Sequence, residues 1–227
     1  MCVARAEADA YVSATNLLIA VNILAYIWEV ASGTRFDSNY SLVAHGALYG
    51  PLVMRGEWWR IVTGGFMHGG IAHVALNMFA LYQLGNFVEA ALGAPRMLAI
   101  YTISLFGGGL AVVYFSPGDV TVGASGAIFG LFGALLAIGV RLGARGRSLI
   151  ASTLPILLIN LAFTFAVPFI SKAGHLGGLA SGFLAGLALF MLRPAAPPGT
   201  PVAVTTGAGE TAEAELLPPE ENVRPVR

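Results

Sequence analysis

Charged residues are nearly absent from the middle of this chain, and their absence limits what the chain can fold into. Between Arg60 and Arg141 the only charged residues are Glu89, Arg96 and Asp119, and each lies where Gly or Pro also breaks an apolar run. A helix that crosses a bilayer needs roughly 20 mainly apolar residues, because the hydrocarbon core is about 30 Å thick. The runs between the breaks have this length. We therefore predict an all-α polytopic membrane protein, and a composition of 56% apolar and 11% charged residues agrees with that class.

The apolar runs predict a six-transmembrane-helix bundle over residues 11–192, after a short N-terminal tail of residues 1–10. The expected helices cover residues 11–30, 71–92, 96–115, 124–141, 149–168 and 174–192. The segment 31–70 is too long and too polar for a tight turn, and its tryptophans favour the membrane interface. We expect this segment to be a structured, partly embedded outer loop. Residues 193–227 are rich in Pro, Gly, Thr, Ala and Glu, which predicts a disordered C-terminal tail.

Arginines in short loops predict the orientation of the bundle, because Lys and Arg are concentrated in cytoplasmic loops. Arg141, Arg145 and Arg147 form the strongest short-loop group and favour a cytoplasmic N-terminus. We expect a multi-pass integral protein of the plasma membrane. The second, fourth and sixth helices would then all start from the outer face, so their first residues share one depth. The formal net charge is zero, so there is no basic surplus of the kind that binds nucleic acid.

Ser125 and His175 each begin a predicted span, where an uncompensated polar group costs several kcal/mol. A serine hydroxyl is a weak nucleophile until a base accepts its proton, and imidazole suits that role near neutral pH. Glycines flank both residues, and small residues four apart let helices approach closely. We therefore predict that the two side chains form a nucleophile and its base. An isolated serine in a glycine-rich helix is better explained by packing, and the histidine is what favours chemistry.

His73 and Asn77 are four residues apart in the second predicted span and share one helix face. Acyl transfer needs hydrogen-bond donors aimed at the developing oxyanion, each worth about 3 kcal/mol. Both side chains are candidates for this role, together with a free backbone N–H at the start of the helix that carries Ser125. The alternative is that they bond each other or a neighbouring helix.

The remaining polar residues of the spans and loops suggest other roles. His68 lies nearer the interface than His73, which favours a structural or substrate-loop role, and Asn160 is expected to hydrogen-bond between helices. The histidines show no His-Glu-x-x-His pattern and no neighbouring carboxylate, so we expect no metal and no other cofactor. Asp119 precedes Ser125 but falls in a predicted outer loop, so a dyad is favoured over a triad.

Taken together, these motifs resemble the rhomboid family of intramembrane serine proteases, in its minimal six-helix bacterial form. They follow the family's order over about residues 57–186. The matching patterns are Glu-Trp-Trp-Arg at 57–60, His-x4-His-x3-Asn at 68–77, Gly-x-Ser-Gly at 123–126 and His-x2-Gly-x3-Gly at 175–182.

The resemblance implies a Ser125–His175 dyad and an oxyanion site formed by His73, Asn77 and the Ser125 backbone. It also implies an intramembrane serine endopeptidase that cleaves transmembrane or membrane-anchored proteins near the outer face. The expected partners are therefore such substrates and membrane lipid, and the oligomeric state stays open. One departure is Phe129, where many bacterial relatives carry a Tyr packed on the catalytic histidine. The Phe ring can still stack there.

Two other functions compete with this one. A transporter or channel would also hold polar residues at membrane depth, but it predicts charged residues along a pathway, and none lies in these spans away from their ends. A non-catalytic rhomboid-like protein that binds transmembrane helices would typically lack the nucleophile or the base. This chain has both.

Overall fold

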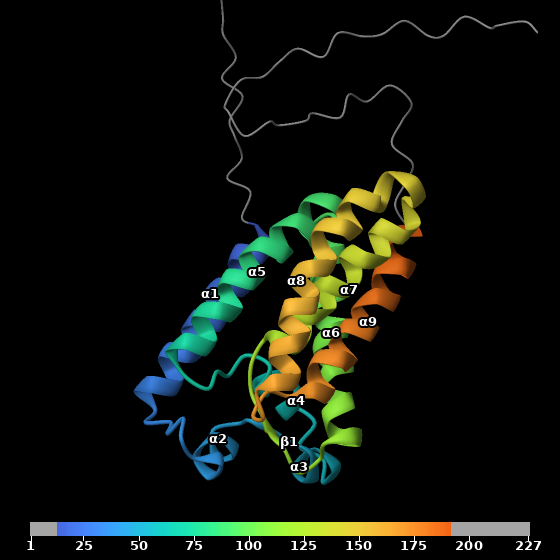
Figure 1. The fold of residues 1–227 in the computed structure, drawn as a ribbon. Helices are drawn as coiled ribbons and strands as arrows, with labels where there is room; N and C mark the ends of the chain where they lie inside the picture. The colour runs from blue at the N-terminus through green and yellow to red at the C-terminus, as the bar shows by residue number, and fades with distance from the viewer. Residues whose placement is uncertain (1–12, 192–227) are drawn as a thin grey trace, which may run out of the picture. The chain divides into compact units, whose positions relative to one another are not determined.

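The computed structural model describes residues 13–191, and nearly all regular structure in this range is helical (Figure 1). The long helices are α1 (Ala14–Ala31), α5 (Ile71–Leu92), α6 (Ala94–Phe115), α7 (Ser125–Arg141), α8 (Arg147–Ala166) and α9 (Lys172–Met191). The short elements are α2 (Asn39–Ala44), β1 (Leu48–Tyr49), α3 (Gly50–Met54), α4 (Arg60–Gly64), β2 (Val120–Thr121) and the 3-10 helix η1 (Gly143–Gly146). The predicted all-α fold class is confirmed, while the tails predicted at residues 1–10 and 193–227 lie outside the described range.

Five helices of the described range are long and apolar enough to cross a membrane. They are α1, α5, α6, α9 and the continuous segment that joins η1 to α8. The fourth predicted span, residues 124–141, corresponds to α7, which is apolar but has only 17 residues. At a rise of 1.5 Å per residue, α7 is roughly 26 Å long, a little less than the hydrocarbon core.

α7 occupies the centre of the bundle. Its buried residues run along its length from Ala127 to Gly139, and it packs most closely against α9. α6 packs against both of these helices. By contrast, large side chains on the outer helices are widely exposed, such as Leu24 on α1 and Phe79 on α5, as lipid-facing residues would be.

Glycines allow the close contact between α7 and α9. A Cβ atom added to Gly178 would overlap the carbonyl oxygen of Gly126, and one added to Gly182 would overlap that of Gly130. The two contacts are four residues apart on each helix, so they lie on one face of α7 and one face of α9. Along these faces the helices touch through their backbones. This confirms the predicted close approach of the two helices that carry Ser125 and His175.

Residues 32–70 form a compact cap of short elements rather than an extended loop. Arg60 is buried within this cap, where its guanidinium donates to the carbonyl oxygens of Val43 (2.7 Å) and Ala47 (3.1 Å) and to the carboxylate of Glu57 (2.6 Å). β1 pairs with β2 in an antiparallel register, with Leu48 opposite Thr121. The cap is therefore tied to the segment that leads into α7.

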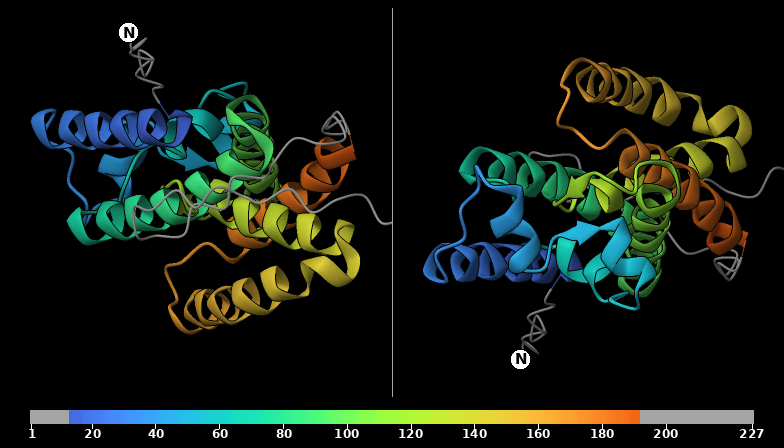
Figure 2. Two further views of the ribbon diagram at one scale, coloured as in Figure 1. Left: turned by 90° about the horizontal axis from the view of Figure 1, so that it is seen from above. Right: turned by 90° about the horizontal axis from the view of Figure 1, so that it is seen from below.

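α1 and α5 lie side by side in both views of Figure 2, and a buried carboxylate joins them near each end. At one end Glu89 of α5 accepts hydrogen bonds from the first turn of α1, including the Thr15 N–H (2.9 Å) and hydroxyl (2.7 Å). Negative charge at a helix N-terminus is favourable because the first N–H groups have no partner within the helix. At the other end Glu29 of α1 accepts from the backbone N–H of His68, just before α5.

α8 lies at the outside of the bundle in both views of Figure 2. Only Thr153, Leu157 and Thr164 are buried along it, and Pro155 interrupts its hydrogen-bond ladder. Asn160 donates to the carbonyl oxygen of Ile156 in the same helix (2.8 Å). The prediction that this side chain forms a hydrogen bond between helices was therefore wrong. An amide that faces outward satisfies itself on its own helix more readily than across a gap.

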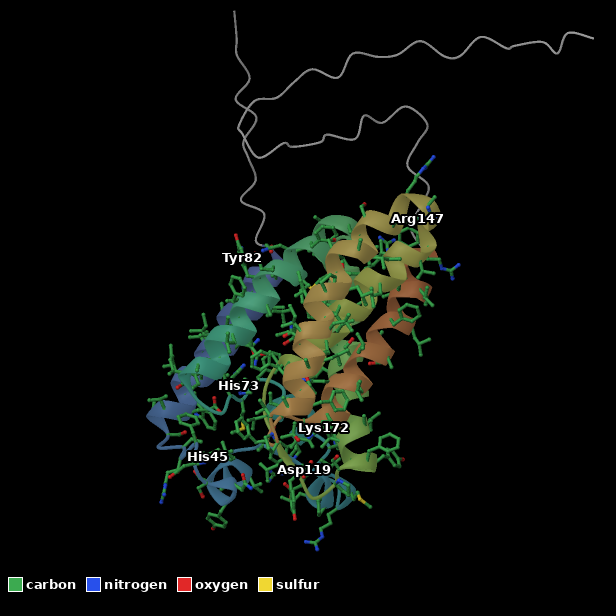
Figure 3. The ribbon with its side chains drawn as sticks, viewed as in Figure 1. His45, His73, Tyr82, Asp119, Arg147 and Lys172 are labelled. Atoms are coloured by element: carbon green, nitrogen blue, oxygen red, sulfur yellow. The ribbon has the colours of Figure 1, made fainter. Side chains whose placement is uncertain are left out.

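The two ends of the bundle differ in their charged and polar residues. Figure 3 labels His45, Asp119 and Lys172 at the end that carries the cap, and Arg147 at the opposite end. His73 lies on the side of the cap. α7 and α9 both begin at the cap end, as does α5, so their first turns share one end of the bundle.

Candidate functional site

Ser125 is the first residue of α7, and the preceding glycine determines how the chain enters that helix. Gly123 has φ of +122°, a conformation that residues with a side chain rarely adopt. Its N–H donates to the carbonyl oxygen of Gly64 in α4 at 2.9 Å, which fixes it to the cap. Because Ser125 follows at the N-terminus of a helix, its backbone N–H has no acceptor within α7.

His175 lies in the first turn of α9, across the glycine contact from Ser125. Its Nε2 atom is 2.8 Å from the Ser125 Oγ atom, a normal hydrogen-bond distance. The Phe129 ring stacks on the imidazole, with centroids 4.1 Å apart and planes inclined by 17°. The structure thus brings together the two residues that the sequence singled out, and the expected stacking of Phe129 is confirmed.

The other imidazole nitrogen, Nδ1, is 2.8 Å from the hydroxyl oxygen of Thr164 on α8. Sequence reasoning missed this residue. A threonine within an apolar helix ordinarily bonds the carbonyl oxygen four residues earlier, and Thr164 does so with Asn160 at 2.8 Å. Nothing in the sequence distinguishes this threonine from one that only satisfies its own helix.

His73 and Asn77 face the backbone that leads to Ser125. A Cβ atom on Gly123 would lie 2.8 Å from His73 Nε2 and 3.5 Å from Asn77 Nδ2, so both side chains pack on that glycine. The Gly69 N–H donates to His73 Nδ1 at 3.2 Å, which leaves the hydrogen of the neutral ring on Nε2. Asn77 Nδ2 is buried, and no hydrogen-bond partner for it occurs among the described residues. Two donors therefore lie beside Gly123, two residues before Ser125.

His68 is fully buried and supports the turn before α5. Both carboxylate oxygens of Glu29 lie 3.1 Å from its backbone N–H, and its Nδ1 is 3.1 Å from the carbonyl oxygen of Phe66. Burial lowers the pKa of His68 to about 4, with a smaller contribution from His73, so the ring is neutral at pH 7. The predicted structural role fits this position. The role of Glu29 was not predicted, although an ionisable residue inside a span usually has a specific partner.

A small cavity of about 30 Å³ adjoins Ser125 and His175. Its lining includes Thr121, Gly123 and Ser171 as well as apolar side chains of α4 and α6. This volume is sufficient for a water molecule, which needs at least about 10–15 Å³ and polar partners. Within residues 13–191 no group of three or more His, Cys, Asp and Glu side chains is arranged to hold a metal ion.

Known proteins match most of this chain. A family model for the rhomboid domain matches residues 55–192. The rhomboid protease GluP of Bacillus subtilis is 42% identical over 177 residues, which are 77% of this chain and 34% of that protein. RHOMBOID-like protein 1 of Arabidopsis thaliana is 37% identical over 161 residues, or 69% of this chain and 41% of that protein.

The putative rhomboid protease YdcA of Bacillus subtilis is 34% identical over 155 residues, which cover 64% of this chain and 78% of that protein. GluP and RHOMBOID-like protein 1 are longer, and this chain spans only 34% and 41% of their lengths. This chain covers most of the length of YdcA. The match to YdcA and the match to the family model agree with the apolar helices, and together they indicate an integral membrane protein. On these matches, the chain belongs to the rhomboid family.

Proposed function

We propose that this protein is an intramembrane serine endopeptidase in which Ser125 is the nucleophile and His175 is its base. The observation that carries the proposal is the 2.8 Å separation between Ser125 Oγ and His175 Nε2. Relatives named rhomboid proteases support intramembrane proteolysis at the level of the family. The substrates would be transmembrane or membrane-anchored proteins.

The reaction would proceed by acyl transfer. Ser125 Oγ forms a bond to the scissile carbonyl carbon while its proton passes to His175 Nε2. The C–N bond then breaks as Nε2 returns that proton to the leaving amine, which leaves an acyl ester on Ser125. Water attacks the ester with His175 again as the base, and the carboxylic acid and free Ser125 are released.

The carbonyl oxygen becomes negative in each tetrahedral intermediate and needs donors. His73 Nε2, Asn77 Nδ2 and the free N–H of Ser125 are suited to this role. The orientation of His73 by Gly69 and the absence of a partner for Asn77 Nδ2 among the described residues support the assignment. Donors fixed in advance stabilise the developing charge without reorganising.

The arginine distribution supports cleavage near the outer membrane face. Arg147 lies at the end of the bundle opposite the cap, Arg141 and Arg145 precede it by no more than six residues, and such clusters favour the cytoplasmic side. Ser125 and His175 begin helices at the cap end, which would then face outward in the plasma membrane. A substrate helix must become extended there before its amide can be attacked, because helical amides are shielded.

The test is cleavage of a model transmembrane substrate by the full chain in proteoliposomes, together with labelling by a fluorophosphonate probe. Ser125→Ala should lose labelling and reduce turnover by at least about 10³-fold, and His175→Ala should reduce turnover similarly. Ser152→Ala, on the exposed face of α8, is the matched control and should cleave like the unmodified protein.

Unchanged cleavage by Ser125→Ala would refute the proposed nucleophile. Binding of the substrate without cleavage by the unmodified protein would instead favour a non-catalytic rhomboid-like function.

A further inference from the structure

The hydroxyl of Thr164 makes two short contacts that together determine the direction of its hydrogen bonds. Its oxygen is 2.8 Å from the carbonyl oxygen of Asn160 and 2.8 Å from His175 Nδ1, and the side chain is only 1% exposed. A carbonyl oxygen can only accept, so the single hydrogen of Thr164 is donated to Asn160. The contact with His175 can then be a hydrogen bond only if Nδ1 carries a hydrogen and donates it.

We propose that Thr164 is a positioning residue that holds neutral His175 in the tautomer with its hydrogen on Nδ1. This inference rests on the proposed function, because it concerns the base of that reaction. In this tautomer the lone pair of Nε2 faces Ser125 Oγ at 2.8 Å and can accept its proton. In the other tautomer Nε2 would donate to Ser125 and could not act as the base.

The surroundings of His175 favour Thr164 as the residue that fixes the tautomer of the imidazole. Phe129 covers one face of the imidazole and offers no acceptor, and His175 is itself buried. The hydroxyl therefore fills the place beside Nδ1 that a carboxylate fills in a catalytic triad, without adding a charge to an apolar bundle. When His175 takes up the proton from Ser125, the bond from Nδ1 to Thr164 is retained.

The contact with Thr164 couples the base to α8, a helix at the outside of the bundle. Ser125, His175 and Thr164 belong to α7, α9 and α8, and Thr164 is one of only three buried residues of α8. A displacement of α8 that lengthens the contact at Nδ1 would remove the preference for the productive tautomer. The position of α8 therefore decides whether His175 is ready to act as a base.

The first test compares two substitutions at this position with a matched control on the same helix. Thr164→Val keeps the shape and removes the hydroxyl, and we expect kcat to fall about 10- to 100-fold with KM nearly unchanged, because a buried donor loses its acceptor. Thr164→Ser restores the hydroxyl and should recover most of kcat. Thr153→Val makes the same change at another buried threonine of α8 and should leave kcat unaltered.

The second test reads the tautomer directly and does not depend on activity. In the full chain with ¹⁵N-labelled histidine, the His175 resonances, assigned by their loss in His175→Ala, should report hydrogen on Nδ1. Thr164→Val should shift them toward hydrogen on Nε2. A resting tautomer with hydrogen on Nε2 would overturn the proposal even if Thr164→Val proved too unstable to assay.

The inference and the function on which it rests fail in different ways. If Ser125→Ala abolishes cleavage while Thr164→Val retains full kcat, the protease assignment stands and the role of Thr164 is refuted. If Ser125→Ala still cleaves, the protease assignment fails first.

Discussion

Two histidines of the site use the same ring nitrogen, Nε2, in opposite protonation states. His175 directs the lone pair of Nε2 at Ser125, whereas His73 directs an Nε2–H toward the backbone beside Ser125. Each state is set by the partner of Nδ1, which is the Thr164 hydroxyl for His175 and the Gly69 N–H for His73. In the proposed reaction one ring accepts a proton and the other donates a hydrogen bond. The same side chain thus serves two tasks because its neighbours differ.

Substitution of Asn77 should separate catalysis from stability. Asn77→Ala removes one proposed oxyanion donor, and we expect kcat to fall by about 10²-fold or more. The Nδ2 atom has no partner among the described residues, so its loss breaks no hydrogen bond of that atom and the unfolding temperature should change little. Steady-state cleavage and thermal unfolding in detergent provide the two measurements. Asn86→Ala, farther along α5, is the control, and a loss of stability without a change in kcat would indicate a purely structural role.

The sequence predicted the role of a single residue only where a polar residue interrupts an apolar span. Ser125 and His175 are polar groups at the start of apolar spans, and His73 and Asn77 share a helix face, so their grouping could be predicted. Thr164 was not, because its ordinary bond to Asn160 already accounts for a threonine in a helix. Its second contact depends on how α8 and α9 meet, which no local pattern encodes.

At the scale of elements, the contact between α7 and α9 determines whether nucleophile and base can meet. The two helices touch through glycine backbones, and Ser125 and His175 lie at the same end of that contact. Helix positions were predicted within a few residues, because Gly, Pro and rare charges mark the ends. The interior of segment 31–70 was not, since α2, α3 and α4 are only five or six residues long and depend on tertiary bonds such as those of Arg60.

A methyl group at Gly178 should push the two helices apart. In Gly178→Ala the new Cβ atom would overlap the carbonyl oxygen of Gly126, a backbone atom that cannot rotate away. We expect a loss of about 1–3 kcal/mol in stability and a marked drop in cleavage. Gly118→Ala is the control, because a Cβ atom there meets nothing within 4 Å. Equal unfolding temperatures and equal cleavage rates for the two variants would contradict the proposed importance of this contact.

The whole molecule has two chemically distinct ends, and its orientation in the membrane determines which compartment supplies water to Ser125. Cysteine labelling can establish this orientation, since Cys2 is the only cysteine and can be replaced by serine. In that background Gly118→Cys, in the connection after α6, should react in intact cells with a membrane-impermeant maleimide. Ala144→Cys, in η1 at the other end, should react only after permeabilisation. The reverse pattern would contradict a cytoplasmic N-terminus and cleavage at the outer face.

The carboxylates of Glu29 and Glu89 also have a consequence for biosynthesis. Glu29 emerges from the ribosome well before His68, and Ser13 and Thr15 emerge long before Glu89. Until α5 has been made and lies against α1, the Glu29 carboxylate and the first turn of α1 lack the partners that they have in the folded protein. The pairing of α1 with α5 is therefore the step at which the nascent chain can satisfy these two carboxylates and the first turn of α1, and it can be completed before Ser125 has been translated.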